Sequence, residues 1–256
     1  MQKTILLCLF LPITQILLAQ TWYVSGTGDD SNDGKTLKIA FRSLQKAADL
    51  VQAGDKVLID KGIYTNADKS SGSVVVSIKS SGKPDAWITW QALQGAKPDI
   101  RPTGWGGISI LGSYHIIDGL TVTGSNDSIV LLTAQEDIKK PTPNPYFNTN
   151  GIVVDGRKNK PDAKPHHVII RNCVVTKCSG GGVVGLETDY LTVEDCLVSG
   201  NAWFMRYGGS GTSTLDNWAF DDAAGYHIII QRNFVWNNKT LVPRLATGLG
   251  LYRDVF

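Results

Sequence analysis

This sequence has few of the residues that hold a chain together covalently. It contains four cysteines in 256 residues, and three of them, Cys173, Cys178 and Cys196, lie beyond the first 19 residues. An odd number of cysteines argues against a disulfide framework. The sequence also lacks a basic block or a stripe of alternating basic and aromatic residues, so nucleic-acid binding has no support.

Long apolar runs are missing after the N-terminus, so no membrane span is expected. The one such run covers residues 4–18, follows Lys3 and is followed by the small residue Ala19. This arrangement is typical of a signal peptide, here residues 1–19, and it predicts a secreted or periplasmic protein. The remaining residues, 20–256, are enough for one domain with a large core.

An internal repeat dominates the rest of the chain. Four segments, beginning at His115, Val168, Leu191 and Ile228, mostly carry apolar residues at their first, third, sixth and eighth positions. Residues two apart on a strand face the same side, so the pattern predicts two short strands around a bend. A third short strand, beginning at a glycine near 107, 151, 182 and 211, precedes each segment.

The spacing of these segments predicts a solenoid. Val168 and Leu191 are 23 residues apart, about one coil, and the larger spacings correspond to a coil plus a loop. Three short strands per coil, stacked in parallel, form a β-solenoid. A β-sandwich would instead join its strands through tight hairpins without a fixed period.

The repeat also places two cysteines. Cys173 and Cys196 occupy the same coil position, with Asn233 next in line. Stacked residues of neighbouring coils lie one strand spacing apart. Two interpretations stay open at this point, an inward ladder of small residues and a disulfide between the two cysteines.

The N-terminal part differs from the repeats. Residues 41–53 have the apolar spacing of an amphipathic helix, with Ser43 as its N-cap and Gly54 as its stop. A short strand follows at 57–59. A helix in this position predicts a cap that covers the open end of the first coil. Residues 20–65 are therefore expected to form the cap and first coil, and residues 66–256 the later coils.

Two stretches resemble a known group of proteins. Residues 22–65, beginning WYVSGTGDDSNDGKT, resemble the N-terminal region of secreted bacterial β-helix proteins, including family-9 pectate-lyase-type polysaccharide lyases and a domain of unknown function found beside them. Residues 189–243, beginning DYLTVEDCLVSGNAWFMRYGG and ending NFVWNNKTLVP, resemble the central coils of lyase-like right-handed parallel β-helix repeat proteins. The resemblance implies an all-β, right-handed, single-stranded parallel β-helix with an N-terminal cap helix. It also implies an acidic polysaccharide, pectate-like, as partner, and a monomer for a full-length relative.

The implied reaction is calcium-assisted β-elimination, in which Ca²⁺ neutralises a uronate and a base removes the neighbouring proton. We expect the site at the matching corners of consecutive coils. The predicted Ca²⁺ ligands are Glu187, Asp189, Asp221 and Asp222. The predicted catalytic cations are Arg206, Lys177 and Lys239, and the predicted substrate-binding aromatics are Trp203, Tyr207 and Trp218. Arg206 and Tyr207 are expected alongside the acidic residues.

Two other functions stay open. A non-catalytic carbohydrate-binding or surface β-helix would use the same aromatics without chemistry, and a glycoside hydrolase would use paired acids such as Asp221 and Asp222. His166 and His167 read as a surface turn, and His115 as a core histidine. In similar proteins the Leu241–Pro243 segment leads into another coil, whereas this sequence stops after TGLGLYRDVF. The sequence therefore predicts a C-terminally truncated chain whose catalytic activity is in doubt.

Overall fold

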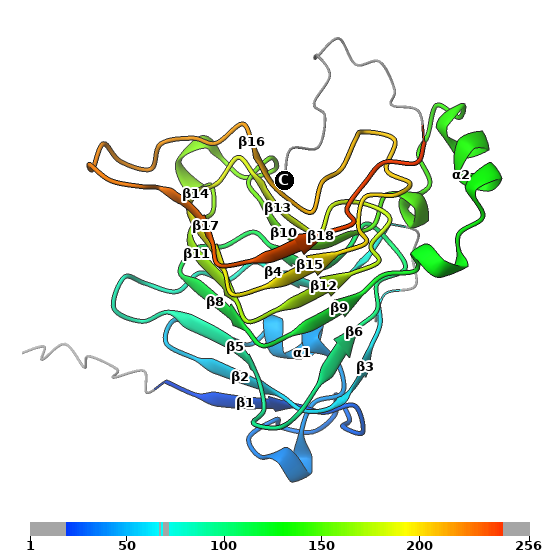
Figure 1. Ribbon diagram of the computed structural model, residues 1–256. Helices are drawn as coiled ribbons and strands as arrows, with labels where there is room; N and C mark the ends of the chain where they lie inside the picture. The colour runs from blue at the N-terminus through cyan, green and yellow to red at the C-terminus, as the bar shows by residue number, and fades with distance from the viewer. Residues whose placement is uncertain (1–18, 67, 69–71, 243–256) are drawn as a thin grey trace, which may run out of the picture.

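The protein, studied as a computed structural model, is a coil of short strands stacked into three parallel sheets (Figure 1). The structure describes residues 19–66, 68 and 72–242. Each full coil contributes one strand to sheet A, one to sheet B and one to sheet C, in that order along the chain. Because the strands of a coil face one interior, the core is a single column inside the three sheets.

The strand bounds are as follows. Sheet A contains β1 (Thr21–Val24), β2 (Lys56–Ile59), β5 (Ile88–Ala92), β8 (His115–Asp118), β11 (His166–Arg171), β14 (Asp189–Glu194) and β17 (Ile228–Gln231). Sheet B contains β3 (Gly62–Tyr64), β6 (Pro98–Ile100), β9 (Thr121–Thr123), β12 (Val174–Thr176), β15 (Leu197–Ser199) and β18 (Phe234–Trp236). Sheet C contains β4 (Val74–Ile78), β7 (Gly106–Ile110), β10 (Asn150–Asp155), β13 (Val183–Leu186) and β16 (Thr212–Leu215).

The observed register confirms the predicted repeat. Val168 pairs with His115 on one side and with Leu191 on the other, and Leu191 pairs in turn with Ile228. Every strand pair is parallel, so the predicted parallel β-helix is confirmed. The predicted inward positions Val168, Ile170, Leu191 and Val193 are buried, whereas in the last strand of sheet A Ile228 is partly buried and Ile230 is 46% exposed. Among the described residues β17 is the last strand of sheet A, so no described strand covers its outer edge.

The bend predicted within each repeat is a single residue in the left-handed region. Between sheets A and B, the corner residues Gly119, Asn172, Asp195 and Arg232 have φ values of 71°, 54°, 53° and 53°. This conformation is easiest for glycine and is tolerated by asparagine and aspartate. One such residue redirects the chain from one sheet to the next, and for this reason the two apolar pairs of a repeat share one interior.

The cysteines form the predicted inward ladder. The backbone N–H of Cys173 donates to Cys196 Sγ at 3.4 Å, and the N–H of Cys196 donates to Asn233 Oδ1 at 2.9 Å. Each side chain therefore satisfies a backbone donor of the preceding coil, where an asparagine would serve equally well. Cys173, Cys178 and Cys196 are all free and buried, so the small-residue interpretation is confirmed over the disulfide.

The N-terminal cap is present, but its helix is shorter than predicted. Helix α1 covers Leu44–Ala48, with the Ser43 side chain accepting from the N–H of Lys46. The chain leaves the helix early because Asp55 binds the N–H groups of Gln52 and Gln20, which turns it into β2. The Gln45 side chain donates to Ser77 O at 3.2 Å and accepts from Ser77 N at 2.8 Å, so it pairs with the open edge of β4.

The long insertion before β10 contains a helix that the sequence pattern did not indicate. Helix α2 (Leu131–Ile138) and three short 3₁₀ segments, at Asn126–Ser128, Pro145–Phe147 and Pro161–Ala163, lie in the inserted loops, and another, at Leu37–Ile39, lies in the cap. In Figure 1, α2 lies beside the corner between sheets B and C. The predicted signal peptide (apart from Ala19) and the predicted final strand lie outside the described residues. Among the helices that are described, none has the length and apolar character needed to cross a membrane.

Candidate functional site

A row of stacked rings follows the corner between sheets C and A. Its members immediately precede the first inward residue of five successive coils: Trp87, Tyr114, His167, Tyr190 and His227. We call this row the ring ladder. From Tyr114 to His227 the rings are nearly parallel, with successive centroids 4.8, 4.3 and 4.1 Å apart. Stacking follows from the register, because equivalent residues of neighbouring coils lie about 4.8 Å apart.

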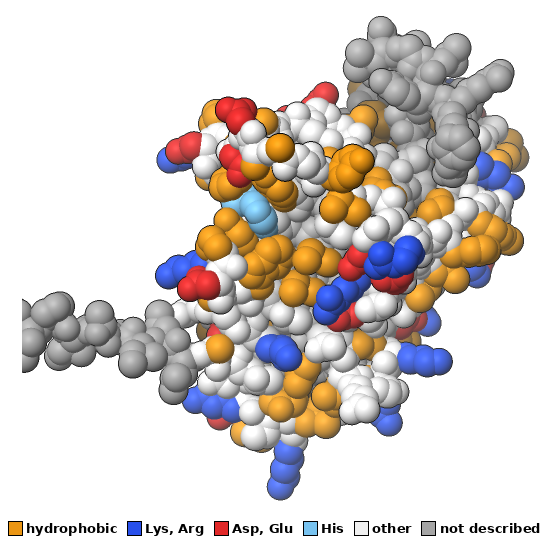
Figure 2. Space-filling view, turned by 60° about the vertical axis from the view of Figure 1, so that its left-hand side comes forward, with side chains coloured by type: hydrophobic (Ala, Val, Ile, Leu, Met, Phe, Trp, Pro, Cys, Tyr) orange, Lys and Arg blue, Asp and Glu red, His pale blue; other side chains and the backbone are white. Residues whose placement is uncertain are grey.

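A second group of rings lies beside the ladder. Phe220, from the loop between β16 and β17, stacks on His166 with centroids 3.9 Å apart, and Trp218 contacts both edge-on. His166 and His167 have their Nδ1 atoms 2.7 Å apart, so one imidazole donates to the other. Three of the four histidines of the chain therefore meet at this corner. Figure 2 shows a histidine set among apolar side chains on this side of the molecule.

Asp189 links the ring ladder to the loop that carries Phe220. Its buried carboxylate accepts hydrogen bonds from the backbone N–H of Phe220 at 2.7 Å and from His227 Nδ1 at 2.9 Å. His227 Nε2 lies 3.0 Å from the carbonyl oxygen of Ala223. A neutral imidazole has one N–H, whereas the imidazolium has two. Two acceptors therefore favour the charged form of His227, with Asp189 as its counter-ion.

Four rings at this corner have shifted pKa values, lowered for His166 and His167 and raised for Tyr190 and His227. Burial lowers the pKa of His167, and also lowers the pKa of His166, to about 4. The carbonyl of Ala223 and then Asp189 raise the pKa of His227. The hydrogen bond from the Tyr190 hydroxyl to Asp221, at 2.6 Å, raises the pKa of Tyr190 to about 12. Neighbouring groups whose pKa values are driven apart are typical of acid–base sites.

Part of the ladder is held in a strained backbone. Tyr114, His167 and Tyr190 have φ values of 60°, 54° and 45°, and this region costs about 1–2 kcal/mol for residues with a Cβ. Strain that the surrounding structure maintains is a frequent property of functional sites.

The four predicted Ca²⁺ ligands do not gather around one point. Glu187 forms an ion pair with Lys164 at 2.6 Å, Asp189 is occupied by protein donors, and Asp221 accepts from Tyr190 and from the N–H of Ala223. Asp222 is exposed. Within the described ranges, no three or more histidine, cysteine or acidic side chains are placed to hold a metal ion. The residues present therefore do not fit the predicted calcium site.

The predicted cations lie at a different corner, so the expectation that Arg206 and Tyr207 lie alongside the acids is wrong. Arg206 is 2% exposed, and its guanidinium donates to the carbonyls of Asp137, Ile138 and Lys140 at the end of α2. This side chain therefore caps the C-terminal end of α2, in addition to the backbone N–H of Lys140, which also donates to the carbonyl of Asp137. Tyr207 is exposed in the same loop, which crosses to α2 because Phe204 packs beside Ala134 in a small second core.

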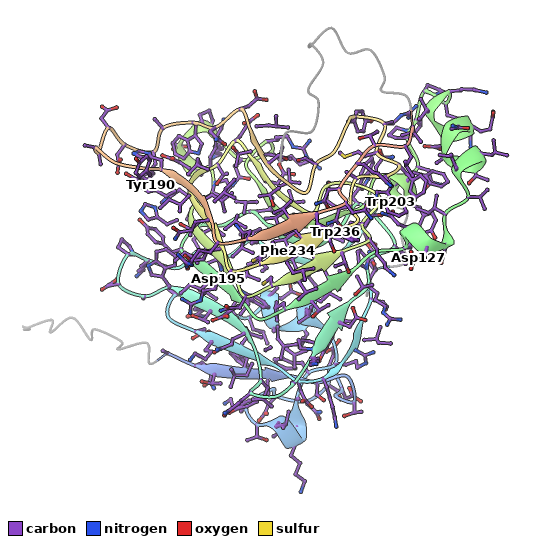
Figure 3. The ribbon with its side chains drawn as sticks, viewed as in Figure 1. Asp127, Tyr190, Asp195, Trp203, Phe234 and Trp236 are labelled. Carbon is purple, nitrogen blue, oxygen red and sulfur yellow. The ribbon has the colours of Figure 1, made fainter. Side chains whose placement is uncertain are left out.

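Lys177, Lys239 and Trp203 share the corner between sheets B and C. Lys177 forms an ion pair with Asp127, and Lys239 Nζ lies 5.1 Å from the centre of the Trp203 ring. Figure 3 shows Tyr190 and Trp203 on opposite sides of the ribbon. Of the residues predicted from the sequence, the ladder corner brings together Asp189, Asp221 and Trp218.

Sequence reasoning missed His166, His167, Tyr190 and His227 as site residues. The signal was available, because the same repeat that aligned the strands also aligns a ring at the preceding position of each coil. His115 was interpreted correctly. It is fully buried, with Nε2 2.8 Å from the carbonyl of Ser80.

Coils of three parallel strands around one core, with a capped N-terminal end, define a right-handed parallel β-helix. The sequence model of the right-handed β-helix region family matches residues 106–242, more than half of the chain. The chain therefore belongs to this family. A comparison with curated protein sequences gives no significant match.

Solved structures share the fold. The GH136 lacto-N-biosidase from Eubacterium ramulus is 19% identical with a TM-score of 0.51, covering 70% of this chain and 34% of that one. A rhamnogalacturonan lyase is 14% identical with a TM-score of 0.44, covering 86% and 69%. A pectate lyase is 14% identical with a TM-score of 0.43, covering 86% and 64%. This chain thus spans about a third of the biosidase, and the likeness concerns the fold alone.

Proposed function

We propose that this protein cleaves an acidic polysaccharide by β-elimination at the ring ladder. The acidic substrate is implied by the resemblance of the sequence to family-9 pectate-lyase-type proteins. The observation that carries the proposal is the stacked row His167, Tyr190 and His227, in which the pKa of His167 is lowered and the pKa values of Tyr190 and His227 are raised. β-Elimination needs a base and a proton donor on one substrate, and this row supplies both.

In this proposal His167 is the base. Its lowered pKa keeps the imidazole neutral near neutral pH. Its Nδ1 is engaged with His166, while its Nε2 has no hydrogen-bond partner among the described residues. When Nδ1 carries the proton, Nε2 presents a lone pair. That lone pair removes the proton next to the uronate carboxyl, and the C–H electron pair becomes the new C=C bond.

Tyr190 is the proton donor. Its raised pKa keeps the hydroxyl protonated over the physiological range. As the C–O bond to the leaving sugar breaks, the departing oxygen takes the phenolic proton, and the imidazolium of the adjacent His227 stabilises the phenolate. His227 itself is a positioning residue, because both of its N–H groups are already directed to Asp189 and Ala223.

No step of this proposal passes through Ca²⁺. Calcium needs six to eight oxygen ligands, and three of the four carboxylates predicted for it, Glu187, Asp189 and Asp221, are occupied by protein donors. The requirement for Ca²⁺ remains a prediction from the sequence resemblance, and a chelator tests it.

The experiment is an assay of products from a panel of acidic glycans, with and without chelator. We expect an unsaturated uronide, detected by its ultraviolet absorbance, and a rate about 100-fold lower in His167→Gln. Tyr226→Phe, a conservative change in an 88% exposed ring next to His227, is the matched control and should keep the wild-type rate. Reducing ends without the ultraviolet signal would indicate a hydrolase, and absence of both products would leave a binding protein.

The pH dependence of the rate provides a second test. The base must be neutral, so the rate should rise with pH through the pKa of His167. That pKa is lowered, so the midpoint should lie below the ordinary histidine value of 6.5. A midpoint above this value would contradict the role of His167.

A further inference from the structure

The outer face of sheet B presents a second set of aromatic side chains, separate from the ring ladder. Strands β9, β12, β15 and β18 each direct two side chains outward, and the register aligns them into two files. We call this surface the sheet-B face. One file is Thr121, Val174, Leu197 and Phe234, and the other is Thr123, Thr176, Ser199 and Trp236.

The two aromatic residues of this face are among the most exposed apolar side chains of the described chain. Phe234 is 62% exposed and Trp236 is 51% exposed, although Val235 between them faces the core. Within the part of the chain that the structure describes, neither ring stacks on another ring. Figure 3 shows Phe234 and Trp236 following one another along β18 toward Trp203. Their flat faces are therefore open to a ligand, which the stacked rings of the ladder do not offer.

The sheet-B face carries no charge of its own. None of the twelve residues of β9, β12, β15 and β18 is ionisable. The charged side chains around it are mostly paired. Asp99, which continues the first file in β6 beside Thr121, binds Arg101. Arg232 binds Glu194 and Asp195 on one side, and Lys177 binds Asp127 on the other. A charged polymer would find no unpaired counter-ion on the strands themselves.

We infer that the sheet-B face binds an extended, uncharged glycan chain. The apolar face of a sugar ring packs on a flat aromatic ring, and Phe234 and Trp236 provide two. Sugar hydroxyls exchange hydrogen bonds with Thr123, Thr176 and Ser199, which follow Trp236 at the strand spacing of about 4.8 Å. A straight file of equivalent residues suits a linear chain that runs along the helix axis.

The experiment measures binding of three soluble neutral polysaccharides, glucomannan, arabinoxylan and mixed-linkage β-glucan, with polygalacturonate for comparison. Wild-type protein should bind at least one neutral probe, and Trp236→Ala or Phe234→Ala should weaken that binding about tenfold. Leu215→Ala is the matched control, because Leu215 is equally exposed but belongs to β16 of sheet C, in the preceding coil. It should bind as wild type does.

Three outcomes would overturn the inference: no neutral probe binds, Trp236→Ala binds as wild type does, or the face is instead a contact between two copies. The last would appear as a concentration-dependent dimer that Trp236→Ala converts to a monomer. The inference does not rest on the proposed lyase activity. His167→Gln should keep the affinity for the neutral probe, and Trp236→Ala should keep the cleavage rate on short acidic fragments, so either idea can fail alone.

Discussion

The ring ladder and the sheet-B face use similar side chains in opposite ways. At the ladder both faces of Tyr190 are covered, by His167 and by His227, and ionisable groups contact one another. On the sheet-B face, Phe234 and Trp236 are exposed and stack on no other ring of the described residues. The difference arises from position in the coil. A ladder ring sits at a corner, where neighbouring coils bring equivalent rings together, whereas Leu197 and Ser199 separate the aromatics of β18 from any other ring. The corners of the coils therefore bring ionisable side chains into contact with one another, whereas the outer faces of the strands leave aromatic side chains exposed to a ligand.

The largest effect on cleavage is expected from a substitution in the ring ladder. Tyr190→Phe keeps the ring stack and removes only the hydroxyl that donates to Asp221. Cleavage should fall about 100-fold or more, since proton transfer by a positioned side chain contributes about 10²–10⁴. Affinity for the neutral probe, measured by titration calorimetry, should stay at the wild-type value. Equal cleavage by wild type and variant would remove Tyr190 from the mechanism.

The second prediction contrasts the ladder imidazoles with the core imidazole of His115, which follows the ladder residue Tyr114 in the chain. Burial lowers the pKa of His115 to about 4, so the folded state takes up fewer protons than the unfolded state between the ordinary value of 6.5 and that pKa. Stability should therefore fall as the pH drops through this window, by about 3 kcal/mol in total. Urea unfolding of wild type and His115→Asn at about pH 7 and about pH 4 measures the effect.

His115→Asn should lose about 3 kcal/mol less than wild type over this interval, because asparagine does not titrate and retains an N–H for the carbonyl of Ser80. An equal loss in the two proteins would mean that other groups cause the acid sensitivity.

The third prediction concerns the anchor of the ladder. Asp189→Asn removes the counter-ion of His227 and weakens the contact with the N–H of Phe220. The pKa of His227, followed by NMR, should fall toward its ordinary value, and cleavage should fall about tenfold as the last ring loses its orientation. Glu187→Gln, a matched change at the same corner in the pair with Lys164, should alter neither quantity. If Asp189→Asn changed only the melting temperature, and neither the pKa of His227 nor the cleavage rate, the role of Asp189 would be structural.

The smallest expected effect lies on the sheet-B face. Ser199→Ala removes one hydroxyl from the file below Trp236. Because a hydrogen bond exposed to water contributes about 0.5–1.5 kcal/mol, binding of the neutral probe should weaken about threefold. Thr192→Ala, on the outer face of sheet A, is the control. Wild-type affinity in Ser199→Ala would confine recognition to the aromatic rings.

Local sequence was sufficient for the fold of this protein. The apolar pairs beginning at Val168, Leu191 and Ile228 define the inward positions, and the period of about one coil defines the register, because a slip by one residue would place every apolar side chain in water. The same repeat located the buried cysteine ladder. The N-cap at Ser43 was also visible, since capping depends on residues three apart.

Contacts between segments distant in the chain decided the rest. Arg206 reads as a catalytic cation in an aromatic loop, yet α2, some 70 residues earlier, takes its guanidinium. Asp189 and Asp221 read as metal ligands, yet Phe220, Tyr190 and His227 supply hydrogen-bond donors to them. Apolar periodicity is a property of one segment, and the hydrophobic effect acts on it without regard to partner. The partner of a polar group depends on which loops the coils bring within hydrogen-bond distance, and only the assembled structure settles that.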